Sequence, residues 1–256
     1  SSLTSLDVTH FNTANVTNMG YMFYSCSSLT SLDVTHFNTA KVTDMSRMFY
    51  NCSSLTSLDV TYFNTEEVRN MSNMFDSCSS LTSLDVTHFN TANVTDMHYM
   101  FSNCVALTSL YLTNFNTEKV TYMYGMFSSC SSLTTIYASS KFVTTQVSNS
   151  SGMFYNCEKL KGEEEWTNDK ATDKTFAKIE GGYFSGGIPR VKYADGTLTF
   201  FLTSKETLGE NEYGIYGLGA KPDWVWKNPN VTKVTKVVFD PAFANARPTN
   251  CYAWFN

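Results

Sequence analysis

Cysteine residues recur at almost equal intervals along much of the chain, and evenly spaced thiols are candidates for metal binding or disulfide formation. The six residues of this column are Cys26, Cys52, Cys78, Cys104, Cys130 and Cys157. A zinc site needs ligands that converge, usually as cysteine pairs close in sequence, and the chain contains no such pair. We therefore predict a row of small, buried, reduced side chains, with no metal site and no cofactor. Cys251 lies outside this column.

Carboxylates and hydroxyls form a second candidate site, because Asp and Ser recur together at the same interval as the cysteines. Oxygen ligands suit Ca²⁺, and a row of like charges also favours a basic or hydrogen-bonding partner. The predicted binding residues are Ser5, Asp7, Ser31, Asp33, Ser57, Asp59, Ser83, Asp85 and Tyr111. The alternative is a solvated acidic row that binds nothing, and we predict no specific metal site.

Histidines form a shorter third column, at His10, His36 and His88. Tyr62 and Asn114 take the same position in other copies, so we predict partly exposed loop residues rather than metal ligands. His98 is expected to lie on a helix face without a partner. The chain has no nucleophile elbow, phosphate-binding glycine loop or metalloprotease motif, and we predict that it is not an enzyme.

Composition and charge narrow the classes of partner. The hydrophobic content of 42% is too high for a disordered chain, and the net charge is −5. No basic stripe occurs, which argues against nucleic acid as a partner. No apolar run reaches the length of about 18 residues that a membrane-spanning helix needs, so we predict no membrane insertion.

An internal repeat sets the positions of all these side chains. Five copies of 26 residues begin at Leu3, Leu29, Leu55, Leu81 and Leu107, and a looser sixth copy begins at Leu133. A unit of this length cannot bury its own apolar face, but stacked copies can, because each copy covers the next. The repeat therefore predicts a stack of coils that presents the same side chains at regular intervals.

Each copy reads as a strand followed by a helix. Leu6 and Val8 alternate with Asp7, which is the period of a strand. Met19, Met22, Phe23 and Cys26 follow the i, i+3, i+4, i+7 stripe of an amphipathic helix, and Asn18 is expected to cap its start. The predicted fold class is therefore an α/β repeat, a right-handed solenoid with short parallel strands and short helices. The strands are expected near Leu6, Leu32, Leu58, Leu84 and Leu110.

The Leu-x-x-Leu-x-Val/Leu-x-x-Phe-Asn pattern and the Val-Thr-Asn/Asp-Met-x-x-Met-Phe-x-x-Cys block resemble a known repeat. The 26-residue unit is similar to that of the BspA-like family of bacterial surface leucine-rich-repeat proteins, over residues 1–160. This resemblance implies a leucine-rich-repeat solenoid, an extracellular location on the bacterial cell surface and a role in adhesion. It also implies that the Ser and Asp column lies on the concave, ligand-binding face.

We predict three segments: a six-coil solenoid at 1–160, a cap or linker at 161–188, and a third segment at 189–256. In the linker, Trp166, Phe176, Tyr183 and Phe184 are expected to cover the open core. The third segment reads as a β-hairpin around Asp195-Gly196, followed by the truncated start of a second leucine-rich-repeat block. The chain is therefore expected to be part of a longer protein.

Two functions from different classes fit this reading. The first is a monomeric surface module that binds an extracellular protein or glycan, without nucleic acid or membrane insertion. The alternative is a structural spacer without a ligand, which the near-identity of the copies favours. A third option is an ice-binding or crystal-binding face made of Thr4, Thr30, Thr56, Thr82 and Thr108.

Overall fold

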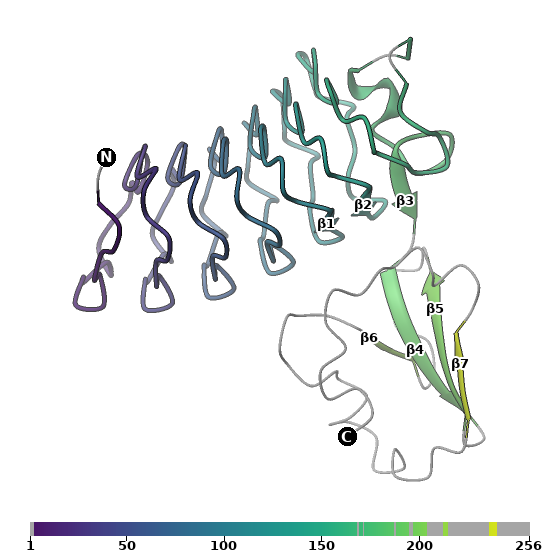
Figure 1. Cartoon of the computed structure of the whole chain (residues 1–256), viewed down its shortest axis with the longest axis horizontal. Coiled ribbons are helices and arrows are strands. Elements are labelled where there is room, and N and C mark those ends of the chain that lie inside the picture. Colours follow the sequence, from purple (N-terminus) through teal and green to yellow (C-terminus); the bar gives the residue numbers. More distant parts are fainter. Residues whose placement is uncertain are drawn as a thin grey trace. The chain divides into compact units, whose positions relative to one another are not determined.

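The computed structural model describes residues 3–167, 169–170, 172–186, 188–194, 197–203, 212–214 and 236–239. The chain divides into two compact units, Ser1–Ser185 and Gly186–Asn256. The first unit is a stack of coils in which each copy of the 26-residue repeat forms one coil (Figure 1). Residues 161–185, most of the segment predicted as a cap or linker, also belong to this first unit.

Backbone hydrogen bonds join neighbouring coils along one edge of the stack. A row of parallel bridges connects equivalent residues of successive coils, namely Asn18, Asp44, Asn70, Asp96, Tyr122 and Asn149. We call residues 19–26 and their equivalents the turn block. Within it, alternate amides donate to the next coil: Met19 N bonds Asp44 O at 2.9 Å, and Phe23 N bonds Met48 O at 2.9 Å. These bonds satisfy the backbone between the coils and fix the spacing of the coils at this edge.

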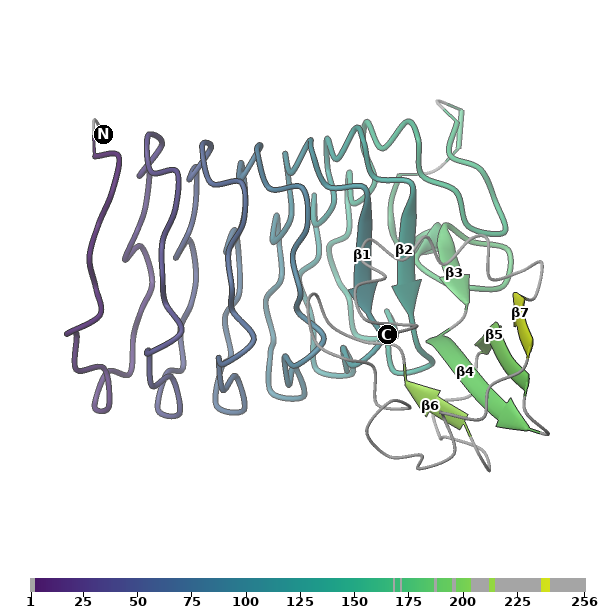
Figure 2. The same ribbon diagram turned by 60° about the horizontal axis from the view of Figure 1, so that its bottom comes forward.

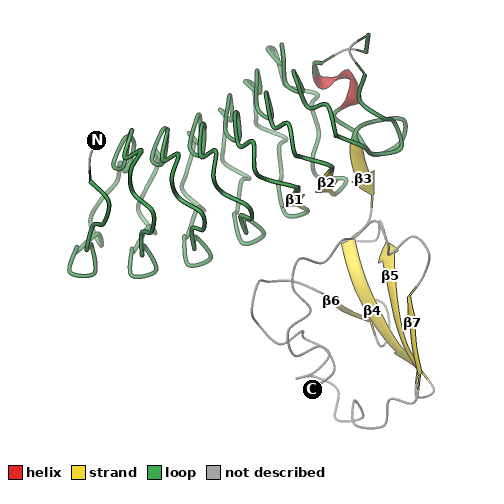
Figure 3. Cartoon of the chain, in the orientation of Figure 1, coloured by secondary structure: helices red, strands yellow, loops and turns green. Residues whose placement is uncertain are grey.

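The turn blocks are not helices, so the predicted α/β fold with short helices is wrong. Among the described residues, the one helical element is the 3-10 helix η1 (Lys174–Phe176), drawn red in Figure 3. Met22 N bonds back three residues to Met19 O, and the alternate amides bond the next coil instead of the i−4 carbonyl. Tyr21 and Ser25 have φ angles of 62° and 56°, which a right-handed helix does not contain.

Asn and Asp side chains form the corners of each coil. Asn18, predicted as a helix cap, instead accepts a hydrogen bond from Gly20 N at 2.7 Å, which makes an Asx turn. Asn12 bonds Ala14 N in the same way, at 3.2 Å. Equivalent bonds recur in later coils, for example from Ser46 N to Asp44. These short polar side chains therefore close turns rather than start helices.

Strands form at only part of the predicted positions within the described coils. β1 (Ser109–Leu112) and β2 (Thr135–Ala138) pair in parallel, with Leu110 opposite Ile136, and β3 (Phe184–Gly186) adds to the sheet in the order β1-β2-β3. No strand is assigned around the four earlier leucines, and those segments are drawn as loops in Figure 3. The described residues of the first unit therefore form a stack of turns and loops with a small sheet at the last coils (Figure 2), rather than a leucine-rich-repeat solenoid of strands and helices.

Stacked apolar side chains fill the interior of the coils. In the second coil Met45, Met48, Phe49 and Cys52 are fully buried, so the helical stripe predicts burial correctly although the backbone differs. The phenylalanine rings of successive coils stack face to face, with centroids 5.7 Å apart between Phe49 and Phe75. A continuous core of this kind requires neighbours on both sides of every coil.

The segment after the sixth coil covers the end of this core. Tyr183 and Phe184 are buried and pack edge-on against Phe154, with centroid distances of 5.2 and 5.9 Å. Trp166 Nε1 donates to Phe154 O at 2.8 Å. Phe176 stacks on Tyr183 at 4.7 Å. The last coil is thus closed by aromatic side chains.

The second unit contains a four-stranded sheet in the order β6-β4-β5-β7. Its strands are β4 (Ile188–Ala194), β5 (Thr197–Thr203), β6 (Glu212–Gly214) and β7 (Lys236–Phe239). β4 and β5 pair antiparallel with Ala194 opposite Thr197, as predicted for a hairpin, and β7 pairs in parallel with β5. The turn residues Asp195 and Gly196, and most of the predicted second repeat block with Cys251, lie outside the described residues. No helix among the described residues is long and apolar enough to cross a membrane.

Candidate functional site

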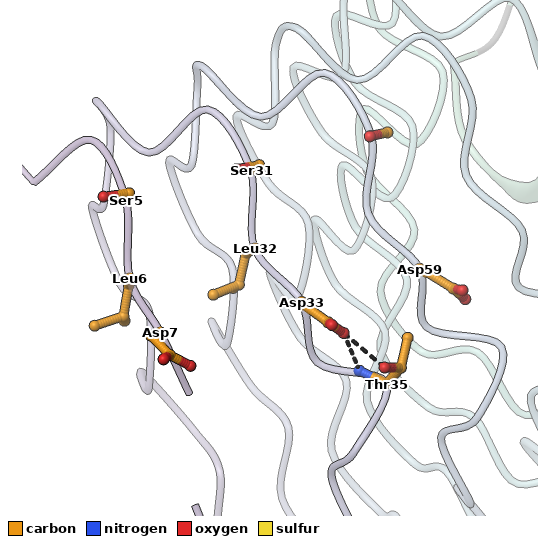
Figure 4. A pocket seen from close by; sticks show the side chains of 9 residues that line it. Ser5, Leu6, Asp7, Ser31, Leu32, Asp33, Thr35 and Asp59 are labelled. Carbon is orange, nitrogen blue, oxygen red and sulfur yellow. Dashed lines mark hydrogen bonds between the residues drawn. The ribbon is translucent and has the colours of Figure 1, made fainter. Parts of the chain in front are cut away.

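The predicted Ser and Asp residues line an open groove across the first three coils. We call this column of nine residues, from Ser5 to Tyr111, the Ser–Asp face. The groove is lined by Ser5, Leu6, Asp7, Ser31, Leu32, Asp33, Thr35, Ser57 and Asp59 (Figure 4). Six of the nine predicted residues therefore share one groove, whereas Ser83, Asp85 and Tyr111 are not among its lining residues.

The groove exists because the coils separate on this face. Backbone hydrogen bonds between the coils are far fewer on this face than between the turn blocks, and the bond from Thr30 N to Thr4 O is long, at 3.4 Å. The exposure of the leucines beneath the face decreases along the stack, as expected if the gap between the coils narrows. The exposed fraction is 8% for Leu32, 7% for Leu58, 5% for Leu84 and 0% for Leu110. The gap therefore closes where β1 pairs with β2.

Each Asp of the face has a structural role that the sequence analysis missed. Asp7 Oδ1 accepts hydrogen bonds from Thr9 N at 3.0 Å and Thr9 Oγ1 at 2.7 Å, and Figure 4 shows the same pair between Asp33 and Thr35. These hydrogen bonds, the side-chain bond first, lower the pKa values of Asp7 and Asp33. The Asp-x-Thr spacing in four copies was the available signal, because Asp followed two residues later by Thr is typical of a turn.

Tyr111 belongs to the sheet rather than to the groove. Its ring stacks on Tyr137 of β2, with centroids 4.7 Å apart and an interplanar angle of 13°. Burial raises the pKa of Tyr111 to about 12, so the phenol is neutral at physiological pH. The position that holds Asp in four coils thus holds a packed aromatic ring in the fifth.

The cysteine column is buried, as predicted, from Cys52 to Cys157, whereas Cys26 is half-buried. The thiols also donate hydrogen bonds: Cys104 Sγ lies 3.1 Å from Phe75 O, and the other buried thiols repeat this contact with the preceding coil. Burial raises the pKa of Cys52 and Cys157 to about 12. These protonated thiols are therefore parts of the coil-to-coil bonding, a role not anticipated from the sequence.

Threonines of the Phe-Asn-Thr segment make a further buried ladder that the sequence analysis missed. Thr65 Oγ1 donates to Asn90 O at 3.0 Å and accepts from Asn90 N at 2.8 Å. Thr91 makes the same two bonds with Asn116. The recurrence of an apparently polar residue beside the core was the signal for this role.

Histidines do not assemble into a metal site in the part of the chain that the structure describes. His10, His36 and His88 are exposed, and no cluster of three potential ligands occurs among the described residues. The prediction that His98 lacks a partner is wrong. Its Nδ1 lies 2.6 Å from Asp96 Oδ1, and its ring stacks on Tyr124 at 4.6 Å.

The repeat that builds this groove also identifies the family. A family model described as Mycoplasma protein of unknown function, DUF285, matches residues 1–84 and 80–181. The chain belongs to the DUF285 family. The matched residues include all six coils and most of the segment that covers the last one. No curated protein and no solved structure matches the chain.

In this DUF285 chain the groove combines regularly spaced hydroxyls with three carboxyl groups. The Oδ1 atoms of Asp7, Asp33 and Asp59 close turns, while their Oδ2 atoms form no hydrogen bond with a described residue. Ser5, Ser31 and Ser57 are exposed beside them. The groove is suited to accept hydrogen bonds from, and attract positive charge on, an elongated ligand.

Proposed function

We propose that this DUF285 chain is a non-catalytic interaction module of the BspA-like type, displayed on a bacterial cell surface. It binds an extracellular protein or glycan, and the Ser–Asp face is the contact surface. The observation that carries this proposal is the open groove, which brings six of the predicted residues together over three coils.

The geometry favours a ligand that is itself repetitive. Successive coils offer the same Ser-Leu-Asp set, so a ligand whose donor groups recur along its length can repeat one contact in each coil. The three groove carboxylates lie in a row of like charge, which a cationic or hydrogen-bond-donating ligand relieves. Binding of this kind weakens as salt is added, because salt screens exposed charges.

A spacer without a ligand is the rival function, and one observation favours it. Each Asp of the column bonds the Thr two residues later, so the turn alone accounts for the recurrence of the carboxylate. The outward Oδ2 atoms are then solvated and have no further role. The two functions differ in whether removal of the charge changes binding while the turn stays intact.

Substitution by Asn separates the charge from the turn, because an Asn side chain keeps an oxygen that can accept the Thr hydrogen bonds. The test compares the parent with D7N/D33N/D59N/D85N on an array of purified extracellular-matrix proteins and glycans. We expect binding to at least one arrayed molecule that weakens about tenfold in the variant and weakens with salt. The matched control is E66Q/E67Q/E118Q/E158Q, which removes four exposed carboxylates elsewhere on the coils. No binding by the parent, or equal binding by both variants, refutes the Ser–Asp face as the site.

A further inference from the structure

The turn blocks carry most of the variation between coils. Their core positions repeat the same residue types in each of the first five copies, and the Ser–Asp face repeats in four. By contrast, the position of Tyr21 holds Arg47, Asn73, Tyr99 and Gly125 in the next four coils. We call the non-core positions of these five turn blocks the turn face. In the first coil they are Gly20, Tyr21, Tyr24 and Ser25.

The composition of the turn face is that of a protein-binding surface. Its 20 residues are Tyr, Ser, Gly or Asn, with three exceptions, Arg47, Asp76 and His98. Fourteen of them are exposed or half-buried, and the buried ones are Ser46, Ser72, Asn73, Asp76, Ser102 and Gly125. Antibody loops are enriched in the same four residue types, because Tyr gives a large contact area at low entropic cost and the small polar residues adapt their hydrogen bonds. Tyr and Arg are also enriched among the residues that dominate binding energy at protein interfaces.

One aromatic cluster lies on the first two coils. Tyr24 and Tyr50 stack with centroids 4.8 Å apart and an angle of 6°, and Tyr21 lies 5.5 Å from Tyr24. Arg47 Nη1 donates to Tyr21 Oη at 2.8 Å, and Arg47 forms no ion pair within the described residues. The stacked rings cover each other's faces, so ring edges, hydroxyls and a guanidinium are presented to a partner. This arrangement suits a protein surface better than the flat face of a sugar ring.

A second aromatic cluster lies on the fourth and fifth coils. Tyr99 is exposed and meets the Tyr124 ring edge-on at 5.0 Å, and His98 stacks on the same ring. Gly125 makes room for Tyr99, because a Cβ at this position would overlap the Tyr99 ring. The ring is therefore held in place by its neighbours before any partner binds.

The third coil connects the two clusters with polar groups. Asn73 is 5% exposed and its Nδ2 has no hydrogen-bond partner, which is rare for a buried amide. Asp76 is also buried, and it accepts hydrogen bonds from Ser77 Oγ at 2.9 Å and Asn103 Nδ2 at 3.3 Å. Because the Asn73 Nδ2 atom is itself buried, a partner docked on the surface does not reach it, and the accessible rings lie on either side of the third coil.

We infer that the turn face is a docking surface for a folded extracellular protein whose contact region presents a carboxylate to Arg47. The guanidinium is the cation of the first cluster, and its remaining N–H groups suit a carboxylate, which arginine binds in a bidentate manner. The backbone beneath is bonded to the neighbouring coils, so little ordering is needed on binding. The turn face shares no residue with the groove of the Ser–Asp face, and the inference holds whether or not that groove binds a ligand.

Two glycine variants test the second cluster with matched backbones. Gly125 and Gly152 have φ angles of 60° and 63°, but a Cβ at Gly152 meets only Tyr155 Cβ at 3.8 Å. G125A should displace the Tyr99 ring, whereas G152A introduces the same backbone strain without displacing a ring. On the array described above, we expect the parent to bind a protein, and G125A to bind it about tenfold more weakly than G152A.

The variant Y24S/R47Q tests the first cluster, and R47K asks whether the guanidinium is needed rather than a positive charge. We expect Y24S/R47Q and R47K to weaken binding of the same arrayed protein, while the control E66Q/E67Q/E118Q/E158Q, whose residues belong to neither surface, leaves it unchanged. Circular dichroism establishes that each variant is folded. The inference is overturned if the parent binds only glycans, if it binds no arrayed protein, or if folded turn-face variants bind as tightly as the parent. Loss of binding in D7N/D33N/D59N/D85N, with the turn-face variants binding as the parent does, would overturn this inference and support the Ser–Asp face instead.

Discussion

Phe75→Ala should be among the most damaging single substitutions in the coil stack. Phe75 is fully buried in the third coil, between the Phe49 ring at 5.7 Å and the Phe101 ring at 5.9 Å, and both pairs are nearly parallel. Truncation removes two ring contacts at once. It also leaves a cavity that relaxes poorly, because the backbone on either side is bonded to the neighbouring coils.

The expected loss in the free energy of unfolding is about 3–5 kcal/mol, which is typical of buried Phe→Ala changes. Two aromatic contacts, each worth about 0.5–1.5 kcal/mol beyond the buried area, place the loss towards the upper part of this range. Phe154→Ala should cost a similar amount, because Phe127, Tyr183 and Phe184 surround that ring in the last coil. Phe23→Ala should cost less, because in the first coil Met22 and Cys26 are only half-buried.

Urea denaturation followed by circular dichroism measures these losses, provided that the slope of the transition is the same in the three variants and the parent. A change in slope would show that the coils unfold in stages, and thermal midpoints for each coil would then replace the single free energy. An equal loss for Phe23→Ala and Phe75→Ala would refute the reasoning, because it would show that the first coil is packed as tightly as the interior. A loss below about 2 kcal/mol for Phe75→Ala would contradict the ring stack itself.

Three further predictions concern hydrogen bonds and burial in the coils. Thr65→Val removes both bonds to Asn90 and should cost about 1–3 kcal/mol by urea denaturation, whereas Val at the exposed Thr56 should have little effect. Burial raises the pKa of Cys52 to about 12, so the folded state keeps a proton that the unfolded thiol loses near its value of 9.0. The contribution of Cys52 to stability should therefore be constant below pH 9 and fall as the pH rises towards 12, as denaturation at several alkaline pH values would show. The hydrogen bonds from Thr9 lower the pKa of Asp7 from 3.8. The contribution of Asp7 to stability is therefore present above pH 3.8 and lost as the pH falls through the pKa of the folded state. An NMR titration of the Asp7 carboxylate that shows no lowering of its pKa would refute the Thr9 bond.

The apolar period of the sequence predicted which side chains are buried, but not the backbone that buries them. The spacing of Met19, Met22, Phe23 and Cys26 is that of a helix stripe. The turn block reaches the same burial by placing Tyr21 and Ser25 in the left-handed region and sending alternate amides to the next coil. Tyr and Ser give no warning of positive φ, since that conformation is usually taken by Gly or Asn. The carbonyl groups that compete for these amides lie in the next coil, so the sequence of a single copy does not reveal them.

The candidate site was predictable as a column of residues but not as a groove. The alternation of Leu6 and Asp7 correctly indicated that the carboxylate points outward. It could not indicate that the coils separate on this face, because the spacing is set by the hydrogen bonds of the turn blocks on another part of the coil. The Asp-x-Thr spacing predicts that Asp7 accepts a hydrogen bond from Thr9 in a turn, but the interpretation of this segment as a strand led us to overlook it.

The two surfaces of the coil stack suit ligands of different kinds. A face that repeats the same residues cannot distinguish one coil from the next, so the ligand proposed for the Ser–Asp face is expected to repeat as well, and its affinity should grow with the number of coils engaged. The turn face differs at every coil, because its backbone bonds to the neighbouring coils through main-chain atoms and leaves the side chains free to vary. A surface of this type can recognise one particular partner, since specificity requires contacts that an alternative partner fails to make. Main-chain hydrogen bonds between the turn blocks, together with the buried side chains of the interior, hold the stack without the outward side chains, and this allows one chain to carry both a uniform and a varied surface.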